Sequence, residues 1–317
     1  MSQKSLIPLT LVSVFAITPG LHAVDRTWVP NSVGSWSDPL LWEGGIRPSA
    51  AGTDSAHLIT GGTATLSGNQ GQIQTLSVGN LDGVTQGALV IDSTGYLRVG
   101  ASFQTSTIRA DSTVTVSGTL TALAGSIFNV GSSAGGGNLI IHSGGLFEHE
   151  GSDGTSTQLR LGAGGGSANV TVDGGTFKVS SVLTLGRSNG SNTTLTVKNG
   201  GVFDGSTTQI NFGAINAGTQ YTDVTATLNI GGETTAEAAG SFSGISRMSG
   251  FGVTNTNILN FNHTSSRYEF VDTDNNNGIE LRAAIEVHLR SGVTVFSNAS
   301  SNYNRGTTIH SGAVLLA

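Results

Sequence analysis

The sequence lacks cysteine, contains only 5 proline residues and has few charged side chains, which make up 11% of its 317 residues. Without cysteine the chain can form no disulfides, thiolate metal sites or cysteine nucleophiles. So little proline, without a strict Gly-X-Y period, excludes a collagen triple helix. The 14 basic residues are scattered and outnumbered by 20 acidic ones, which argues against nucleic acid as a partner, because phosphate binding requires clustered basic side chains.

Glycine is abundant instead, with 47 residues. Serine, threonine and asparagine fill much of the remaining polar sequence, and like glycine they favour turns over helices. Apolar residues still make up 37% of the chain and its net charge is only −6, so the chain is too hydrophobic and too weakly charged to be disordered. The composition therefore predicts an all-β protein with many turns.

The first 23 residues have the pattern of a signal peptide. Lys4 precedes an apolar stretch at 6–17, and a Thr-Pro-Gly break leads to Ala23, after which we expect cleavage. The apolar stretch is too short to span a membrane. A buried N-terminal helix or strand is the alternative, but the polar, turn-rich sequence that follows favours export of the mature chain.

Internal repeats organise the middle of the chain. Three segments combine a short alternating strand, a Gly-Gly turn and a second strand with phenylalanine: 139–147, 170–177 and 195–203. Another strand with an apolar-polar-apolar-glycine pattern follows each one, at 159–162, 183–186 and 210–213, with weaker relatives at 97–100 and 128–131. Units that repeat about every 25 to 30 residues are typical of stacked arrays, because no single unit can bury its apolar face alone.

Apolar and polar residues alternate within these strands, as in Val170, Val172, Phe177 and Val179, so one face of each strand belongs to a core. We therefore predict a right-handed parallel β-helix, or β-solenoid, with irregular turns. A flat sandwich of hairpins is the alternative, since Asp-Gly-Gly and Asn-Gly-Gly can also form hairpin turns. A sandwich does not usually contain successive units with the same internal order.

Residues 279–290 combine helical and strand features. Leu281, Ile285 and Leu289 have helical spacing and are accompanied by the Glu, Arg and Ala of a helix. However, every odd position from 279 to 289 is apolar, and every even position is polar apart from Ala284. This period of two favours one or two strands over a helix.

The C-terminal segments 292–297, 303–309 and 311–316 resemble the autotransporter-associated β-strand repeat, also called the passenger-associated transport repeat. That pattern contains a strand, Ser-Gly-x-Asn-x-Tyr, x-Gly-Gly-Thr-Thr-Ile and Gly-x-Leu-x-Leu. Arg305 stands where the first glycine of the pair is usual, and the link at 298–302 is one residue longer. The sequence around Trp28, Trp36 and Trp42, and the segments at 259–262 and 268–270, are also similar to what accompanies the repeat.

The resemblance implies a secreted or surface-displayed passenger of a bacterium with an outer membrane, folded as a parallel β-helix. It implies no catalytic residues, because the characteristic positions of the repeat are structural. The outer-membrane translocation machinery would be a partner, and an extracellular glycan or matrix ligand is possible. Since the chain ends on the apolar strand 313–317 with no barrel segment, we expect it to be part of a longer autotransporter-type protein.

We divide the chain into four parts on this basis. They are a signal peptide, 1–23; an N-terminal Trp-containing β capping region, 24–75; β-solenoid repeats, 76–250; and C-terminal solenoid rungs, 251–317, including the autotransporter-associated repeat at 291–317.

Few residues form a recognisable site. The glycine-rich run at 162–166 lacks the Lys-Ser/Thr of a phosphate loop, and 240–244 has phenylalanine where a hydrolase elbow has its serine. His142 and His149 flank a Gly-Gly turn without a third zinc ligand. Asp272, Asp274 and Asn276 match the first oxygen positions of a calcium loop, but its glycine comes late and Glu is missing at its end, so a polar turn is the favoured interpretation.

The acidic residues suggest no active site. Glu148, Glu150 and Asp153 form the densest cluster, which we interpret as a solvated loop. When the repeats are aligned on their Gly-Gly pairs, Ser143, Asp173 and Asn199 occupy equivalent positions, which we interpret as turn-forming. The same alignment places Asp204 and Lys178 at equivalent positions, which suggests an ion pair in solvent.

The sequence thus predicts no catalytic, cofactor-binding or metal-binding residues. We expect a secreted or cell-surface β-helix passenger with a structural, adhesin-like role, and not an enzyme. The alternative is a polysaccharide-degrading or polysaccharide-binding β-helix protein, which would need carboxylates that converge on one groove.

Overall fold

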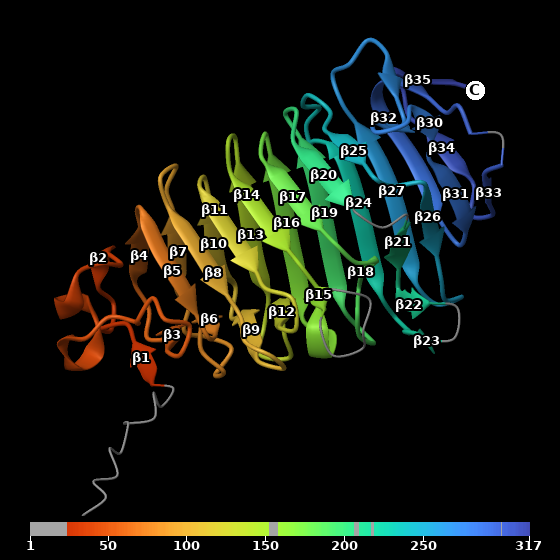
Figure 1. The fold of residues 1–317 in the computed structure, drawn as a ribbon. Helices are drawn as coiled ribbons and strands as arrows, with labels where there is room; N and C mark the ends of the chain where they lie inside the picture. The colour runs from red at the N-terminus through yellow and green to blue at the C-terminus, as the bar shows by residue number, and fades with distance from the viewer. Residues whose placement is uncertain (1–23, 152–157, 206–208, 217–218, 299) are drawn as a thin grey trace, which may run out of the picture.

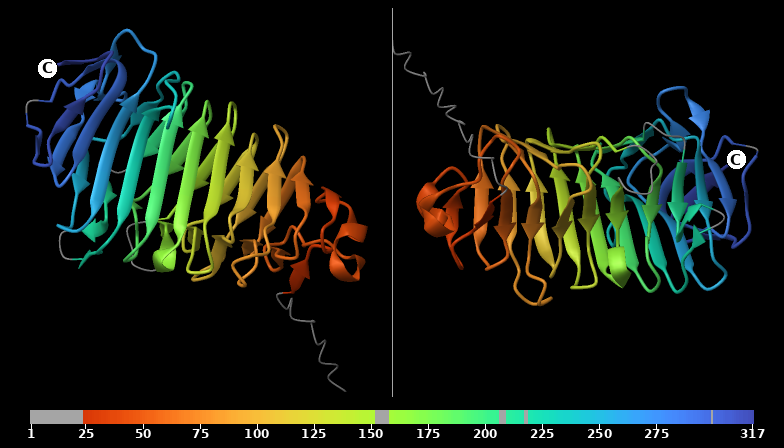
Figure 2. Two further views of the ribbon diagram at one scale, coloured as in Figure 1. Left: turned by 180° about the vertical axis from the view of Figure 1, so that it is seen from behind. Right: turned by 60° about the horizontal axis from the view of Figure 1, so that its bottom comes forward.

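The chain winds into a stack of rungs, each of which contributes one strand to each of three long sheets (Figure 1). A computed structural model describes residues 24–317 except 152–157, 206–208, 217–218 and 299. The stack is elongated, and the two ends of the described chain lie at its opposite ends (Figure 2). The described residues contain no α-helix. The prediction of an all-β parallel β-helix is confirmed, whereas the predicted signal peptide lies outside the described residues.

Strands of successive rungs pair in parallel and form the three sheets. The 11-stranded sheet comprises β1 (Asp25–Thr27), β3 (Ser55–Leu58), β6 (Leu76–Val78), β9 (Thr105–Ile108), β12 (Ile127–Val130), β15 (Leu159–Leu161), β18 (Leu183–Leu185), β21 (Gln209–Phe212), β26 (Arg247–Gly250), β31 (Glu280–Ala283) and β33 (Asn302–Tyr303). The 13-stranded sheet comprises β2 (Val33–Ser35), β4 (Thr63–Leu66), β7 (Ala88–Ile91), β10 (Ser112–Val116), β13 (Gly137–His142), β16 (Ser167–Asp173), β19 (Asn192–Lys198), β24 (Thr225–Gly231), β27 (Thr256–Asn262), β32 (Glu286–Val295), β28 (Tyr268–Glu269), β34 (Thr307–Ile309) and β35 (Ala313–Leu316). The 9-stranded sheet comprises β5 (Asn69–Ile73), β8 (Tyr96–Val99), β11 (Thr119–Ala122), β14 (Leu146–His149), β17 (Thr176–Val179), β20 (Val202–Gly205), β25 (Ser241–Ser243), β29 (Val271–Asp272) and β30 (Asn277–Gly278).

The remaining elements are short. They are the antiparallel pair β22 (Ala214–Asn216) and β23 (Thr219–Gln220), and the 3-10 turns η1 (Pro39–Leu41), η2 (Glu43–Gly45) and η3 (Ala163–Gly165).

Connections between the sheets differ in length. The chain passes from the 13-stranded to the 9-stranded sheet through tight turns in several rungs, as between β16 and β17, but through the longer segment 232–240 between β24 and β25. It leaves the 11-stranded sheet through longer ones, from Leu161 to Ser167 and from Phe212 to Thr225, and the connection from β14 to β15 is also long.

Inward side chains form one continuous apolar core along the stack. Phe147, Phe177, Phe203 and Phe242 occupy the same position in successive rungs of the 9-stranded sheet, and their ring centroids lie 5.4 to 6.0 Å apart. Such aromatic pairs add about 0.5–1.5 kcal/mol each beyond the burial of their area. The repeated phenylalanine of the sequence is therefore a column that ties each rung to the next.

Three buried tryptophans pack together at the N-terminal end of the stack. The ring of Trp42 lies edge-on to Trp28, at 5.1 Å, and to Trp36, at 4.9 Å. The indole Nε1 of Trp42 donates to the carbonyl oxygen of Trp36 at 2.8 Å. The cluster thus covers the first core layer with large apolar side chains, and the indole N–H groups of Trp28 and Trp42 are hydrogen-bonded.

The Gly-Gly pairs of the tight turns have a steric cause. The first glycine, such as Gly200, has a positive φ of 75°, which residues with a side chain rarely adopt. The second has no room for a side chain, since a Cβ on Gly201 would lie 2.4 Å from the carbonyl oxygen of Val172 in the preceding rung. Both requirements recur at the equivalent Gly144 and Gly145.

Two predictions about particular strands have different outcomes. Residues 279–290 form β31 and the first half of β32, so the preference for strands over a helix is confirmed. The grouping of 97–100 with the strands at 159–162 and 183–186 is wrong, because β8 belongs to the 9-stranded sheet. Strands of both sheets need the same apolar-polar-apolar order, so this short pattern does not distinguish them.

Candidate functional site

The residues that the sequence singled out do not converge. His142 is exposed at the end of β13, whereas His149 is fully buried among the core residues of β14. Burial lowers the pKa of His149 to about 4, so its ring is neutral at physiological pH. The two histidines therefore lie in different environments, one in solvent and one in the core.

Asp272 and Asp274 form the polar turn that the sequence favoured. Strands β29 and β30 pair antiparallel across it. The carboxylate of Asp272 accepts hydrogen bonds from the backbone amides of Gly244, at 2.8 Å, and Asp274, at 3.1 Å, and from the side-chain amide of Asn275, at 2.9 Å. Asp274 accepts one from the hydroxyl of Ser243 at 2.6 Å. These oxygens are thus engaged in holding the turn against the preceding rung.

Two members of the acidic cluster near residue 150 form ion pairs with other rungs. Glu148 lies 2.9 Å from the ammonium of Lys178, and Glu150 lies 3.7 Å from Arg98, while Asp153 lies outside the described residues. The alignment of Lys178 with Asp204 is confirmed by the strand register. Lys178 lies between Glu148 and Asp204 in this outward row and hydrogen-bonds Glu148, which raises the pKa of Lys178.

The predicted equivalence of Asp173 with Ser143 and Asn199 is wrong. The strand register pairs Asp173 with His142 on one side and Lys198 on the other. The turn after β16 is one residue shorter than its neighbours, so counting back from Gly-Gly shifts the alignment by one position.

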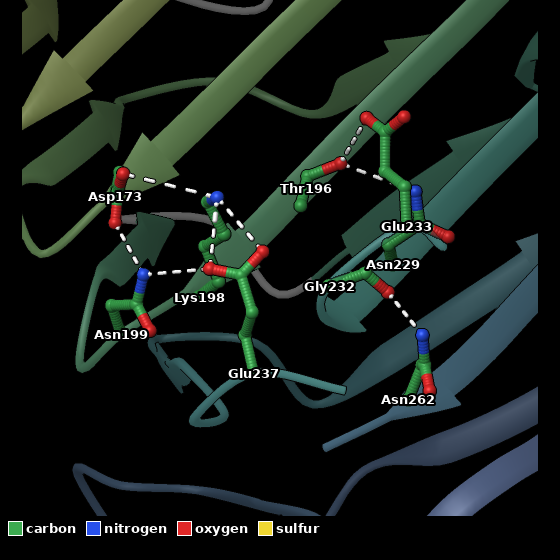
Figure 3. Close-up of polar contacts among 9 residues, drawn as sticks. All are labelled: Asp173, Thr196, Lys198, Asn199, Asn229, Gly232, Glu233, Glu237 and Asn262. Atoms are coloured by element: carbon green, nitrogen blue, oxygen red, sulfur yellow. Dashed lines mark hydrogen bonds and ion pairs between the residues drawn. The ribbon is translucent and has the colours of Figure 1, made fainter. Parts of the chain in front are cut away.

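This register places Asp173 in a charged cluster around Lys198, on the outer side of the 13-stranded sheet (Figure 3). The ammonium of Lys198 lies 3.0 Å from both carboxylate oxygens of Glu237 and 3.8 Å from Asp173. The side-chain amide of Asn199 donates to Asp173 at 2.7 Å and to Glu237 at 3.0 Å. Because Glu237 belongs to the 232–240 segment between β24 and β25, the cluster fastens that segment to the sheet.

Next to this cluster, a chain of hydrogen bonds crosses four rungs of the same outer face. Arg290 donates to Asn260 at 2.9 Å, and Asn260 donates to Asn229 at 3.0 Å. Asn229 then donates to Thr196 at 3.1 Å, and Thr196 donates to Glu233 at 2.9 Å (Figure 3). Thr196, Asn229 and Asn260 are only 2–3% exposed, so this part of the outer face is covered and its polar groups are occupied.

The outer face of the 11-stranded sheet is different, because several of its polar atoms have no partner. Asn129 and Arg160 are adjacent in the register of β12 and β15, and Gln158 precedes β15 on the same face. The side-chain oxygens of Asn129 and Gln158 and the Nε of Arg160 are buried without a hydrogen bond. Arg187 lies one rung further on, where its backbone amide donates to the carbonyl oxygen of Leu161 at 3.0 Å.

No family model, curated protein or solved structure matches this chain. Its function is therefore inferred from its own residues.

The described residues contain no group of three or more His, Asp or Glu side chains that could hold a metal ion. None of the helices in the described part of the chain has the length and apolar character that crossing a membrane requires. Sequence reasoning missed the group of polar atoms without partners that Asn129, Gln158 and Arg160 place on the outer side of the 11-stranded sheet. An arginine in the outward position of a Leu-x-Leu-Gly strand was the signal that could have pointed to it.

Proposed function

We propose that the chain is a secreted or surface-displayed β-helix passenger that acts as a rigid, adhesin-like stalk outside the cell. The supporting observation is that three parallel ladders and one apolar core continue through the stack. In such an array each rung contacts only its neighbours, so stability grows by adding similar units and the molecule extends in one direction. A regular, elongated body of this kind suits presentation at a distance from the membrane.

Export is tested by expressing the full chain with a C-terminal epitope in an outer-membrane bacterium. We expect the exported protein to begin at Val24 when its N-terminus is sequenced, and to be accessible to protease on intact cells or in the medium. A control lacking residues 1–23 should stay inside the cell. Retention of the full chain in the cytoplasm would refute the proposal of export.

The stalk role is tested by removing one rung. Val170 and Leu195 are register partners, so deleting 170–194 joins Asn169 to Leu195 and keeps every later residue on its face. The matched control deletes 170–193, which brings Thr194 into the inward position of Val170 and reverses the faces that follow within the strand. A stalk should fold and reach the surface after the first deletion and not after the second. Loss of surface display with both would contradict it.

A second candidate function is polysaccharide binding. It is supported by Arg160, a half-buried outward side chain of the 11-stranded sheet whose Nε has no hydrogen-bond partner. We propose binding and not degradation, because the two carboxylates that the sequence considered are paired: Glu148 with Lys178 and Asp173 with Lys198. Turnover of a polysaccharide by the purified chain, abolished by Glu148→Gln or Asp173→Asn, would overturn this part of the proposal.

A further inference from the structure

Two histidines of neighbouring rungs lie side by side at the C-terminal end of the stack, where β32 and β34 pair (Figure 1). His288 lies in β32. His310 directly follows β34, and its backbone amide donates to the carbonyl oxygen of Leu289 at 2.8 Å. The two imidazole rings are stacked at an interplanar angle of 25°, with centroids 5.8 Å apart. The backbone positions of both residues are therefore held by the strand ladder.

The ring nitrogens are spaced like two ligands of one metal ion. Nδ1 of His288 and Nε2 of His310 lie 3.5 Å apart, which is the outer limit of a hydrogen bond. At a metal–nitrogen distance of about 2.0–2.1 Å, this separation corresponds to an angle of about 115–120° at the ion, close to that of a tetrahedral site. His310 is exposed and the side chain of His288 is 18% exposed, so an ion can reach both from solvent.

Glu286 prepares His288 to bind a cation. Its carboxylate lies 2.8 Å from Nε2 of His288, where it accepts the ring proton, so Nδ1 of the neutral ring carries the lone pair. A carboxylate in this place orients a metal-binding histidine and raises its basicity. Arg290 shares this face of β32 and opposes a cation, but it is itself hydrogen-bonded to Asn260 at 2.9 Å.

The ligand set defines the kind of metal. No third His, Asp or Glu side chain of the described chain completes a metal-binding group with the two histidines, so water fills the remaining positions. Imidazole nitrogens suit transition metals such as copper, nickel and zinc, whereas Mg²⁺ and Ca²⁺ prefer oxygen ligands. Among the divalent ions of the first row, Cu²⁺ binds such nitrogens most tightly.

We propose that His288 and His310 bind one divalent transition-metal ion, Cu²⁺ most tightly, with Glu286 as a positioning residue. His310 takes the tautomer with its proton on Nδ1, so that Nε2 is free for the ion. The ion then joins β32 to the segment after β34 and fastens two rungs across the outer face of the 13-stranded sheet. This inference depends neither on the stalk role nor on polysaccharide binding.

The test titrates the purified full chain, without a polyhistidine tag, with CuCl₂, ZnCl₂ and MgCl₂ by isothermal titration calorimetry. We expect one site for Cu²⁺, weaker binding of Zn²⁺ and no binding of Mg²⁺. Electron paramagnetic resonance of the Cu²⁺ complex should show coupling to two imidazole nitrogens. Bound Cu²⁺ should also slow proteolysis of the 303–317 segment, because a ligand that binds only the folded rung stabilises it.

Variants decide whether these residues form the site. His288→Ala and His310→Ala should each weaken Cu²⁺ binding at least about tenfold, because each removes one of the two ligands. The control His57→Ala/His142→Ala removes two histidines from other parts of the surface and should change the affinity by less than about twofold. Glu286→Gln should weaken binding about tenfold while coupling to two nitrogens is retained, since Glu286 acts through His288. Circular dichroism confirms that each variant is folded.

Several results would overturn the proposal. They are no binding of Cu²⁺ by the folded wild type, undiminished binding by a folded His288→Ala or His310→Ala variant, and an equal loss of affinity in the control double variant. Coupling of bound Cu²⁺ to fewer than two nitrogens would contradict the paired site. Tighter binding of Zn²⁺ than of Cu²⁺ would overturn the assigned preference.

Discussion

The buried His149 makes the stability of the fold dependent on pH in a way that one substitution can isolate. Its ring is fully buried, with Ala122 and Val179 as register partners in the rungs on either side. Burial lowers its pKa to about 4 from the ordinary value of 6.5. Below pH 6.5 the unfolded chain therefore binds a proton that the folded chain excludes, and stability falls as the pH falls.

The size of this effect follows from the gap between the two pKa values. At about 1.36 kcal/mol for each pH unit, the loss develops between about pH 6.5 and about pH 4 and reaches about 3 kcal/mol. Above pH 6.5 the ring is neutral in both states and contributes no pH dependence. Other titrating groups also contribute, but they are shared by the wild type and a His149 variant and cancel in the difference.

The assay is urea unfolding of wild type and His149→Val between about pH 7 and about pH 4.5. We expect the free energy of unfolding to fall more steeply for the wild type, so that the difference between the proteins changes by about 2–3 kcal/mol over this range. His142→Val, at an exposed position, is the matched control and should follow the wild type. Parallel pH profiles for His149→Val and wild type would refute the reasoning.

Three further variants test packing, turn geometry and the charged cluster. Phe177→Ala should lower the free energy of unfolding by about 3–5 kcal/mol, because it opens a cavity in the aromatic column. The control Phe103→Ala, at a ring that is 71% exposed, should lower it by less than about 0.5 kcal/mol. Equal effects of the two substitutions in urea unfolding would contradict a stabilising role of the column. Gly201→Ala should lower the thermal midpoint through a clash costing about 1–3 kcal/mol, and a midpoint equal to wild type would contradict the turn geometry. Lys198→Met should lower the free energy of unfolding by about 1 kcal/mol at low salt and by less at high salt. Proteolysis of the 232–240 segment, which contains Glu237, should become faster. A loss of stability that does not depend on salt would contradict an electrostatic role of Lys198.

The architecture could be predicted because its physical cause is local. Period-two alternation places Val170 and Val172 inward in any β-structure, and glycine pairs at fixed intervals mark where the chain turns. The same alternation identified 279–290 as strands despite its helix-forming residues, because the odd positions must all face one side. Repetition then favoured a stack over a sandwich.

Register and sheet membership were less predictable. The strand at 97–100 has the same inward-outward-inward order of side chains as strands of the 11-stranded sheet. Its sequence therefore does not reveal to which of the three sheets of the β-helix it belongs. Asp173 was misaligned because one turn is a residue shorter, and the apolar partners, not the glycines, determine the pairing. The alignment of Lys178 with Asp204 was predicted, but not that Glu148 belongs to the same row and is the carboxylate that the lysine contacts.

The candidate site could not be found by motif because its residues come from different rungs. Asn129 in β12 and Arg160 in β15 are brought together only by the stacking of two strands of the 11-stranded sheet, while Arg187 lies in the connection after β18. Their individual positions look like ordinary outward positions in the sequence. What distinguishes Asn129 and Arg160 is that each has a buried polar atom without a hydrogen-bond partner among the residues that the structure describes.

The direction of the ladders also determines how the molecule would respond to force. Hydrogen bonds between neighbouring rungs lie along the long axis, so tension applied to its two ends loads the rungs in series and separates the weakest junction first. The 9-stranded ladder is thinnest between β25 and β29, where Phe242 and Asp272 are the only register partners. The 13-stranded ladder is continuous beside this junction, with seven register pairs between β24 and β27, so we expect it to carry most of the load there.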